Sequence, residues 1–188
     1  MKCIIGLGNP GDRYASTKHN FGYWVIDSFL KNNDLQLKLG KNDYVFAKTD
    51  KVVIAKPTSF MNNSGFSVSM VVKDFNIEYS DLVVVYDDID INLGSIRFKY
   101  GGSSGGHRGL DSAIYHLKSQ QFVKLKLGIA TDMNMRPAEN YVLEPFPSRL
   151  EDKVQQTIDR ACEALDFWLE NTINETMNHF NRRIKGES

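Results

Sequence analysis

The hydrophobic positions of this chain change their spacing several times along its length. Short apolar or alternating runs, typical of β-strands, are separated by stretches in which apolar residues recur every three or four positions, as in helices. A Thr-Asp step between two of the short runs predicts a β-hairpin. The run that follows the turn Asn-Leu-Gly is expected to pair beside the strand before that turn. The predicted strands cover residues 2–8, 44–48, 51–57, 82–89, 95–100 and 123–130.

Helical spacing fills the regions between these strands and the C-terminal third of the chain. Two helices are expected in that third, each opened by a capping box: Ser148 with Glu151, and Thr172 with Glu175. A glycine-rich mobile loop is expected at 101–106 and a polar loop at 131–140. The predicted helices and their inward-facing residues are 21–33 (Phe21, Trp24, Val25, Ser28, Phe29), 62 or 64 to 76 (Val68, Val71, Val72, Phe75), 108–119, and a helix after Ser148 (Leu150, Val154, Ile158, Ala161, Leu165, Trp168).

Strands that alternate with helices favour an α/β fold, a layered structure with a mixed β-sheet. The length of 188 residues fits a single domain, 1–188, with ordinary globular composition: 41% hydrophobic and 24% charged residues. No apolar run has the length of a membrane span, and the first residues lack the features of a signal peptide. Cys3 and Cys162 match no metal-binding spacing. We therefore expect a cytoplasmic protein.

The 23 basic and 23 acidic residues give no formal net charge, so a nucleic acid would have to be held by a local basic face. One predicted loop, helix and strand carry a cluster of basic residues that indicates such a face. The alternating lysines of its strand can equally be solvent-facing positions. The cluster comprises Arg97, Lys99, Arg108, Lys118, Lys124 and Lys126.

Gly6, Gly8 and Gly11 form the pattern Gly-x-Gly-x-x-Gly of dinucleotide-binding folds. In those folds a helix begins within the motif, and an acidic residue follows about 20 residues later. Here Asn9, Pro10 and Gly11 are typical of a turn, helical spacing resumes only near Phe21, and the acid is missing. Turn-forming glycines explain the pattern better than a bound pyrophosphate, and dinucleotide binding is a distant alternative.

Two further patterns suggest other chemistries. The stretch 88–94 resembles a calcium loop, but its glycine falls one place late and Lys99 stands where a bidentate Glu is required, so a solvated turn at Asp90 and Asn92 is expected instead. The loop 101–106 satisfies Gly-x-Ser-x-Gly, the nucleophile elbow of serine esterases. Such an esterase would use Ser104 with a later Asp and His, for which Asp132 and His179 are the candidates. This is the alternative hydrolase, although the several glycines favour a flexible loop.

Four polar residues form a scattered set: Asn9, His19, Asn62 and Asp87. Asn9 follows the first predicted strand and Asp87 ends the central one, and ligands of open α/β sheets collect outside the carboxyl ends of strands. Asn62 lies at or near a helix start, where free N–H groups point outward. Each residue also has a structural explanation, as a cap, a turn former or a surface acid. Spacing alone leaves their joint function open.

The chain resembles the bacterial peptidyl-tRNA hydrolase family along most of its length. The motifs GLGNPGDRY, TKHNFG, KPTSFMNNSG, YDDIDINLGSIRFKYGGSSGGHRG, LKLGIA and YVLEPF occur in the family's order and spacing. The resemblance implies a single α/β domain with a twisted mixed sheet between helices, acting as a monomer without a metal or cofactor. It also implies the activity, which is hydrolysis of the ester between a peptide and the 3′ ribose of tRNA. That reaction recycles tRNA from prematurely released chains.

The resemblance carries roles to matching positions. His19 matches the family's general base, Asp87 the carboxylate that supports it, and Asn9 the residue that tells peptidyl from free aminoacyl esters. Further positions match residues at the substrate and the tRNA end. These are Tyr14, Phe60, Met61 and Asn62, with His107 and Arg108 in the motif Gly-Gly-His-Arg-Gly, and Lys99 and Lys126, which fall where the family holds tRNA phosphates.

Three positions depart from the family's pattern. Lys18 stands where Arg is usual before His-Asn, and Lys126 where Arg is common. Lysine is a point charge without the bidentate fork of arginine, so phosphate contacts are expected to be looser. Arg108 replaces an Asn that positions water or substrate, and an arginine donates hydrogen bonds but cannot accept them.

The chemistry suits these residue types. A neutral imidazole is a base at cytoplasmic pH, and a carboxylate on its other nitrogen fixes the tautomer and stabilises the imidazolium. An amide such as that of Asn62 can stabilise the oxyanion that develops on an acyl ester. Asn9 would discriminate because polar groups placed for a peptide amide stay unpaired beside a free ammonium. A catalytically inactive RNA-binding module is the alternative from another class.

Overall fold

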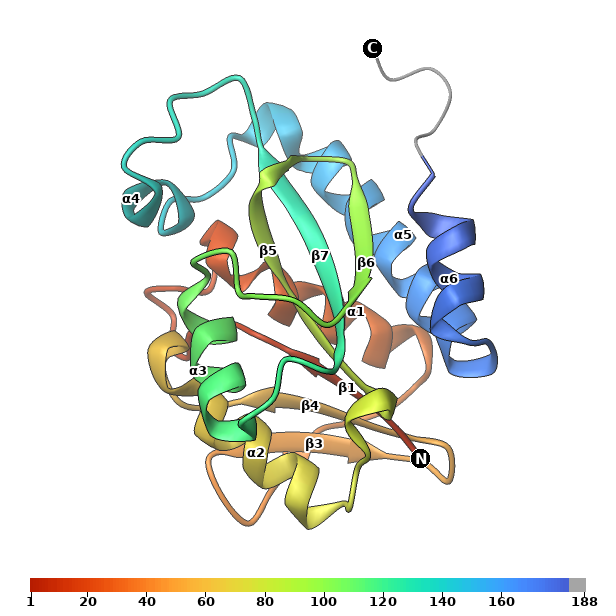
Figure 1. The fold of residues 1–188 in the computed structure, drawn as a ribbon. Coiled ribbons are helices and arrows are strands. Elements are labelled where there is room, and N and C mark those ends of the chain that lie inside the picture. The colour runs from red at the N-terminus through yellow and green to blue at the C-terminus, as the bar shows by residue number, and fades with distance from the viewer. Residues whose placement is uncertain (183–188) are drawn as a thin grey trace.

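The computed structural model describes residues 1–182, in which a seven-stranded mixed β-sheet carries helices on both faces (Figure 1). The last six residues of the expected domain 1–188 lie outside the described part. The strand order is β2-β3-β4-β1-β5-β7-β6, and β4, β1, β5 and β7 run parallel. The strands are β1 (Lys2–Gly6), β2 (Lys38–Leu39), β3 (Tyr44–Lys48), β4 (Val52–Pro57), β5 (Leu82–Asn92), β6 (Ile96–Tyr100) and β7 (Val123–Ala130).

The helices divide between the two faces of this sheet. Side chains of α1, α5 and α6 pack with one set of strand residues, and those of α2 and α3 pack with the other. The helices are α1 (Phe21–Asn32), α2 (Ser64–Asp74), α3 (Arg108–Leu117), α4 (Ala138–Val142), α5 (Glu151–Glu170) and α6 (Ile173–Phe180), with short 3₁₀ turns η1 (Lys18–Asn20), η2 (Met61–Asn63), η3 (Tyr79–Asp81) and η4 (Ser148–Leu150). Within residues 1–182 no helix combines the length and apolar character needed to span a bilayer.

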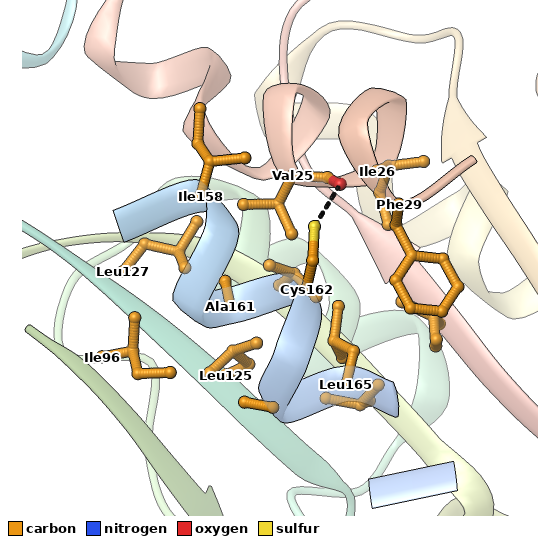
Figure 2. Close-up of a cluster of buried hydrophobic side chains, with 14 of the residues drawn as sticks. Val25, Ile26, Phe29, Ile96, Leu125, Leu127, Ile158, Ala161, Cys162 and Leu165 are labelled. Carbon is orange, nitrogen blue, oxygen red and sulfur yellow. Dashed lines mark hydrogen bonds between the residues drawn. The ribbon is translucent and has the colours of Figure 1, made fainter. Parts of the chain in front are cut away.

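The apolar stripe predicted for the first C-terminal helix forms the core of one layer. Figure 2 shows Ile158, Ala161 and Leu165 of α5 between α1 and the sheet strands β6 and β7. Cys162 is buried in the same layer, and its thiol donates to the carbonyl of Val25 at 3.7 Å. Each fully buried aliphatic side chain stabilises the fold by roughly 1.5–3 kcal/mol. The predicted α/β fold with a helical C-terminal third is therefore confirmed.

Strand β6 lies at a different place from the one expected. The hairpin of β3 and β4 is confirmed, but β6 pairs antiparallel with β7, and β7 lies between β5 and β6. The prediction that 95–100 pairs beside 82–89 is wrong. Strand β7 is buried along almost its whole length, which suits an interior position, whereas Arg97 and Lys99 of β6 are exposed and suit an edge strand.

Four smaller expectations also fail. Asp90 and Asn92 belong to the extended end of β5 and do not form a solvated turn, and β5 runs past Asp87. The polar stretch 131–140 ends in the first residues of α4. Ser148 opens only the turn η4, because α5 begins at Glu151 without a side-chain cap, whereas the capping box of Thr172 and Glu175 is present at α6.

The glycines of the first motif serve packing more than turning. A side chain at Gly6 would overlap α1 at Ile26 and at the carbonyl of Gly22, and a side chain at Gly8 would overlap the ring of Tyr23. Gly11 alone among the three has a positive φ, +95°. No helix begins between Gly6 and Gly11, so the arrangement of a dinucleotide fold is absent.

Candidate active site

A cleft opens at the carboxyl ends of β1 and β5, between segments that lead to opposite faces of the sheet. Strand β1 leads to α1 on one face, whereas β5 and β6 lead to α3 on the other. Such divergence creates a crevice in open α/β sheets. The cleft has a volume of about 890 Å³, and loop 104–107, α4 and η2 supply its walls. Its lining includes the sequence-predicted residues Asn9, Tyr14, His19, Phe60, Met61, Asn62, Asp87, His107 and Arg108.

The carboxylate of Asp87 is buried between two imidazoles. Nδ1 of His19 lies 3.0 and 2.9 Å from the two carboxylate oxygens, and Nε2 of His107 lies 3.0 Å from Oδ1. The two rings are 4.8 Å apart between centroids. Burial alone would raise the pKa of Asp87, but the charges and hydrogen bonds of His19 and His107 hold it well below the ordinary value. The ionised carboxylate therefore accepts from both rings.

These hydrogen bonds fix the tautomers of both rings. Since Nδ1 of His19 donates to a carboxylate, the unprotonated nitrogen of a neutral His19 is Nε2. His107 caps α3, and its Nδ1 accepts the N–H of Leu110 at 3.2 Å, so its proton lies on Nε2 and is donated to Asp87. The sequence had placed His107 with the substrate contacts. Apart from the motif Gly-Gly-His-Arg-Gly, nothing in the sequence indicates that His107 is a second hydrogen-bond partner of Asp87.

The surroundings of His19 raise its pKa. Burial lowers the pKa of His19, but the charge of Asp87 and its hydrogen bond outweigh burial and raise the pKa above the ordinary value of 6.5. The guanidinium of Arg108 opposes this rise. Arg108 itself reaches across the cleft mouth to Glu139 of α4, with 3.3 Å between Nη2 and Oε2. Both side chains are mostly exposed, so this ion pair contributes little to stability.

Asn9 is held by three hydrogen bonds that orient its side chain. Its backbone N–H and C=O pair with the side-chain amide of Asn20, at 2.8 and 2.9 Å. Its Oδ1 accepts the N–H of Met61 at 2.7 Å. Because a backbone N–H is only a donor, the oxygen of Asn9 faces Met61 and the NH₂ group remains as a donor. Asn20 thus sets the position of Asn9.

Aromatic and amide side chains form the outer part of the cleft. Tyr14 and Phe60 pack edge to face, with centroids 6.1 Å apart, and Phe60 is half exposed. Asn62 lies exposed on η2 beside the buried Met61. At the inner side, Tyr86 of β5 has a buried hydroxyl with no hydrogen-bond partner among the described residues, and its ring lies 4.9 Å from that of His107.

The predicted basic residues do not all point to solvent. Lys99 is exposed on β6, outside the cleft lining, and Lys126 of β7 pairs with Asp88 at 3.0 Å. Lys124 is fully buried, with its ammonium on the carbonyl of Gln120 and over the ring of Phe122. Burial, together with the charges of Lys99 and Lys126, lowers the pKa of Lys124 to about 8. Lys124 therefore drops out of the predicted phosphate-binding face.

The serine esterase predicted as an alternative, and a metal ion, can both be judged against the site. Ser104 lines the cleft, but its candidate partners lie elsewhere: Asp132 pairs with Arg149 at 2.9 Å, and His179 stacks on Phe167. The Ser-His-Asp arrangement of a serine esterase is therefore wrong for these residues. A metal ion could find ligand atoms on His19, Asp87 and His107, which lie within 4.8 Å of one another. It would have to displace the two ring protons that the carboxylate already accepts.

Comparisons with known proteins find one family along the chain. The sequence model of the family described as peptidyl-tRNA hydrolase matches residues 3–187. Among solved structures, the chain is similar to a peptidyl-tRNA hydrolase from Acinetobacter baumannii, with a TM-score of 0.89 and 30% identity over 96% of this chain and 94% of that one. A peptidyl-tRNA hydrolase solved with N-propanol matches with a TM-score of 0.90 and 29% identity, over 99% and 97% of the two chains.

Proposed function

The chain belongs to the peptidyl-tRNA hydrolase family, and from this premise we propose that His19 is the general base of ester hydrolysis in its cleft. The enzyme cleaves the ester that joins a peptide to tRNA. The bond at issue is the one between the peptide, or an N-blocked amino acid, and the 3′ ribose. A monomeric, cytoplasmic enzyme is the prediction that accompanies this role.

The single observation that carries the proposal is the pairing of His19 with Asp87. Nδ1 donates to an ionised, buried carboxylate, so Nε2 of the neutral ring is free to take a proton from water. As the imidazolium forms, the carboxylate stabilises its charge. General base catalysis of this kind contributes roughly 10² to 10⁴ in rate. His107 holds the other side of the carboxylate and keeps it oriented.

The acyl part of the substrate is recognised by amide groups in this proposal. The NH₂ group of Asn9 is a donor, which suits the carbonyl that a peptidyl ester carries and a free aminoacyl ester lacks. Asn62 lines the same cleft and can donate to the developing oxyanion. Arg108, which stands where the family has Asn, contributes a positive charge at the mouth, balanced by Glu139.

The tRNA end binds by stacking and by charge in this proposal. Tyr14 and Phe60 offer an aromatic corner for the terminal base. The exposed Lys99 and the partly exposed Lys126 offer positive charge for phosphates on the neighbouring strands β6 and β7. In this proposal the terminal base binds in the cleft of His19, and the phosphates bind outside it on β6 and β7.

Replacement of His19 by Ala tests the base assignment. We expect His19→Ala to lower peptide release from an N-acetylated aminoacyl-tRNA by roughly 10² to 10⁴, because water loses its base. Binding of deacylated tRNA should remain within a factor of three. The measurements are single-turnover hydrolysis and tRNA titration, with the unblocked aminoacyl-tRNA as comparison substrate.

His116→Ala is the matched control, since His116 is an exposed histidine on α3 whose ring contacts only its own helix and nearby aromatics. It should hydrolyse like the wild type. Retention of more than a tenth of the wild-type rate by the His19 variant would exclude His19 as the base.

A further inference from the structure

Lys18 immediately precedes His19 and is fully buried. Its ammonium donates to three main-chain carbonyls, those of Tyr141 at 3.1 Å, Glu144 at 3.3 Å and Pro145 at 3.2 Å. An ammonium has three N–H donors, so every one is used. The ammonium also lies 4.0 Å from the ring centroid of Tyr141. Lys18 thus joins the segment before the base to the end of α4.

The burial of this charge needs an explanation other than stability. Lys18 forms no ion pair within residues 1–182, and burial lowers its pKa while Glu144 raises it. A buried cation costs desolvation free energy, and an apolar side chain of similar volume often does as well or better for stability. What the ammonium adds is geometry, because three carbonyls converge on one point and fix the register of two segments.

The segment that Lys18 holds is a wall of the cleft. Val142 and Leu143 lie between the carbonyls that Lys18 binds, and both line the cleft that His19 faces. The backbone reinforces the same junction: the N–H of Lys18 donates to the carbonyl of Glu144, and Thr17 forms a β-bridge with Pro145. At its outer end the wall is joined to α3 by the exposed pair of Arg108 and Glu139. The contacts of Lys18 and the neighbouring backbone, at the inner end, therefore set the position of the wall relative to His19.

We propose that Lys18 is a positioning residue of the hydrolysis, which holds the α4 wall at a fixed distance from His19 through its three carbonyl contacts. This inference rests on the proposed function of His19. The wall keeps the acyl end of the substrate against the base and its water. Misplacement of reacting groups by about 1 Å can cost 10² in rate. The phosphate-binding lysines lie on β6 and β7, so binding of the tRNA body does not depend on Lys18.

Lys18→Met keeps most of the length and the apolar contacts of the side chain but removes the ammonium from the three carbonyls; the carbonyl of Glu144 keeps the backbone N–H of residue 18. We expect kcat for an N-acetylated aminoacyl-tRNA to fall at least tenfold, with KM and the affinity for deacylated tRNA within a factor of three. Lys18→Arg, which retains a buried cation with several N–H donors, should recover most of kcat. Faster hydrogen exchange of the amides in 141–145 should accompany the loss in Lys18→Met.

The chain offers a matched control in Lys2. Its ammonium donates to the carbonyls of Trp168 and Asn171 and lies 4.6 Å from the centroid of the Trp168 ring, the same chemistry at the opposite end of β1. Lys2 is only partly buried and has two carbonyl partners, so Lys2→Met should lower the thermal midpoint by less than Lys18→Met and leave kcat unchanged. If Lys18 had only a structural role, kcat would fall in both variants in proportion to their loss of thermal midpoint.

Three outcomes overturn the inference. One is a folded Lys18→Met enzyme with wild-type kcat, another is loss of kcat in both lysine variants in proportion to their stability, and the third is failure of Lys18→Arg to recover rate. If Lys18→Met does not fold, Lys18→Gln replaces it in the same comparison. His19→Ala is assayed alongside. If it keeps its activity, the proposed function fails; if it loses activity and Lys18→Met does not, only the role of Lys18 fails.

Discussion

At the scale of single residues, the site depends on one buried carboxylate shared by two imidazoles. Asp87 is almost completely inaccessible, and its two oxygens accept from His19 and His107. The sequence supplied His19 and Asp87 as candidates through motif and resemblance. It could not show that His107 completes the set, because a histidine at a helix N-cap is well explained by the cap alone. Only the position of Asp87 under that cap reveals the second contact.

The pH dependence of Asp87→Asn tests this arrangement. A base works when neutral, so the wild-type rate should fall as the pH drops through the raised pKa of His19. Without the carboxylate charge, burial and Arg108 dominate and lower that pKa. The fall in rate at low pH, which is the acid limb of the profile, should therefore move to lower pH. The rate at neutral pH should fall by roughly 10³ to 10⁴, because the tautomer is no longer fixed. The measurement is a profile of kcat/KM against pH.

Asp90→Asn serves as the control for that profile. Asp90 is exposed on the same strand and lines the same cleft, but it does not contact His19. Its acid limb should coincide with that of the wild type. An unchanged or upward-shifted limb in Asp87→Asn would contradict the assignment of the carboxylate.

At the scale of elements, two similar capping sequences behave differently: one forms a capping box and the other does not. Thr172 accepts the N–H of Glu175 at 3.2 Å, and Glu175 accepts the N–H of Thr172 at 2.8 Å. Ser148 makes no such contact, because the turn η4 inserts three residues before α5. A capping sequence thus allows a capping box but does not ensure one. Whether the box forms depends on how the preceding chain enters the helix.

The two boxes give a paired prediction on stability. Thr172→Ala should lower the free energy of unfolding by about 1 kcal/mol, the usual cost of a lost N-cap. Ser148→Ala should change it by less than about 0.5 kcal/mol, because this hydroxyl makes no cap. Urea denaturation of both variants measures the difference. Equal losses would mean that the hydroxyl of Thr172 is not used as a cap in solution.

At the scale of the whole molecule, the chain has no formal net charge on which to attract a nucleic acid. The formal charges cancel, 23 against 23, so attraction of a polyanion depends on local faces. The structure reduces the predicted basic face, since Lys124 is buried and Lys126 is paired with Asp88. Arg97 and Lys99 remain as exposed basic residues of β6, with Arg97 opposite Lys126 and Lys99 opposite Lys124.

The salt dependence of tRNA binding tests that face. Affinity for deacylated tRNA should fall as salt rises, and Lys99→Met should reduce the slope of log K against log salt by about 1, the value for one lost phosphate contact. Lys31→Met, an exposed lysine on α1, should leave the slope unchanged. Filter binding at several salt concentrations measures both. A slope reduced equally by both variants would mean that the face is diffuse.

The sequence by itself determined most of the helices and strands, though not α4, β2 or the last part of β5, because the spacing of apolar residues reports which sides of a segment are buried. It also determined the family, through motifs whose residues serve one cleft. Tertiary structure decided the neighbours: β7 between β5 and β6, Lys124 inside the protein, and Lys18 bonded to a carbonyl 123 positions away. These follow from the packing of the sheet and its helices. That packing decides which groups a buried polar side chain meets, and the residues next to it in the sequence do not.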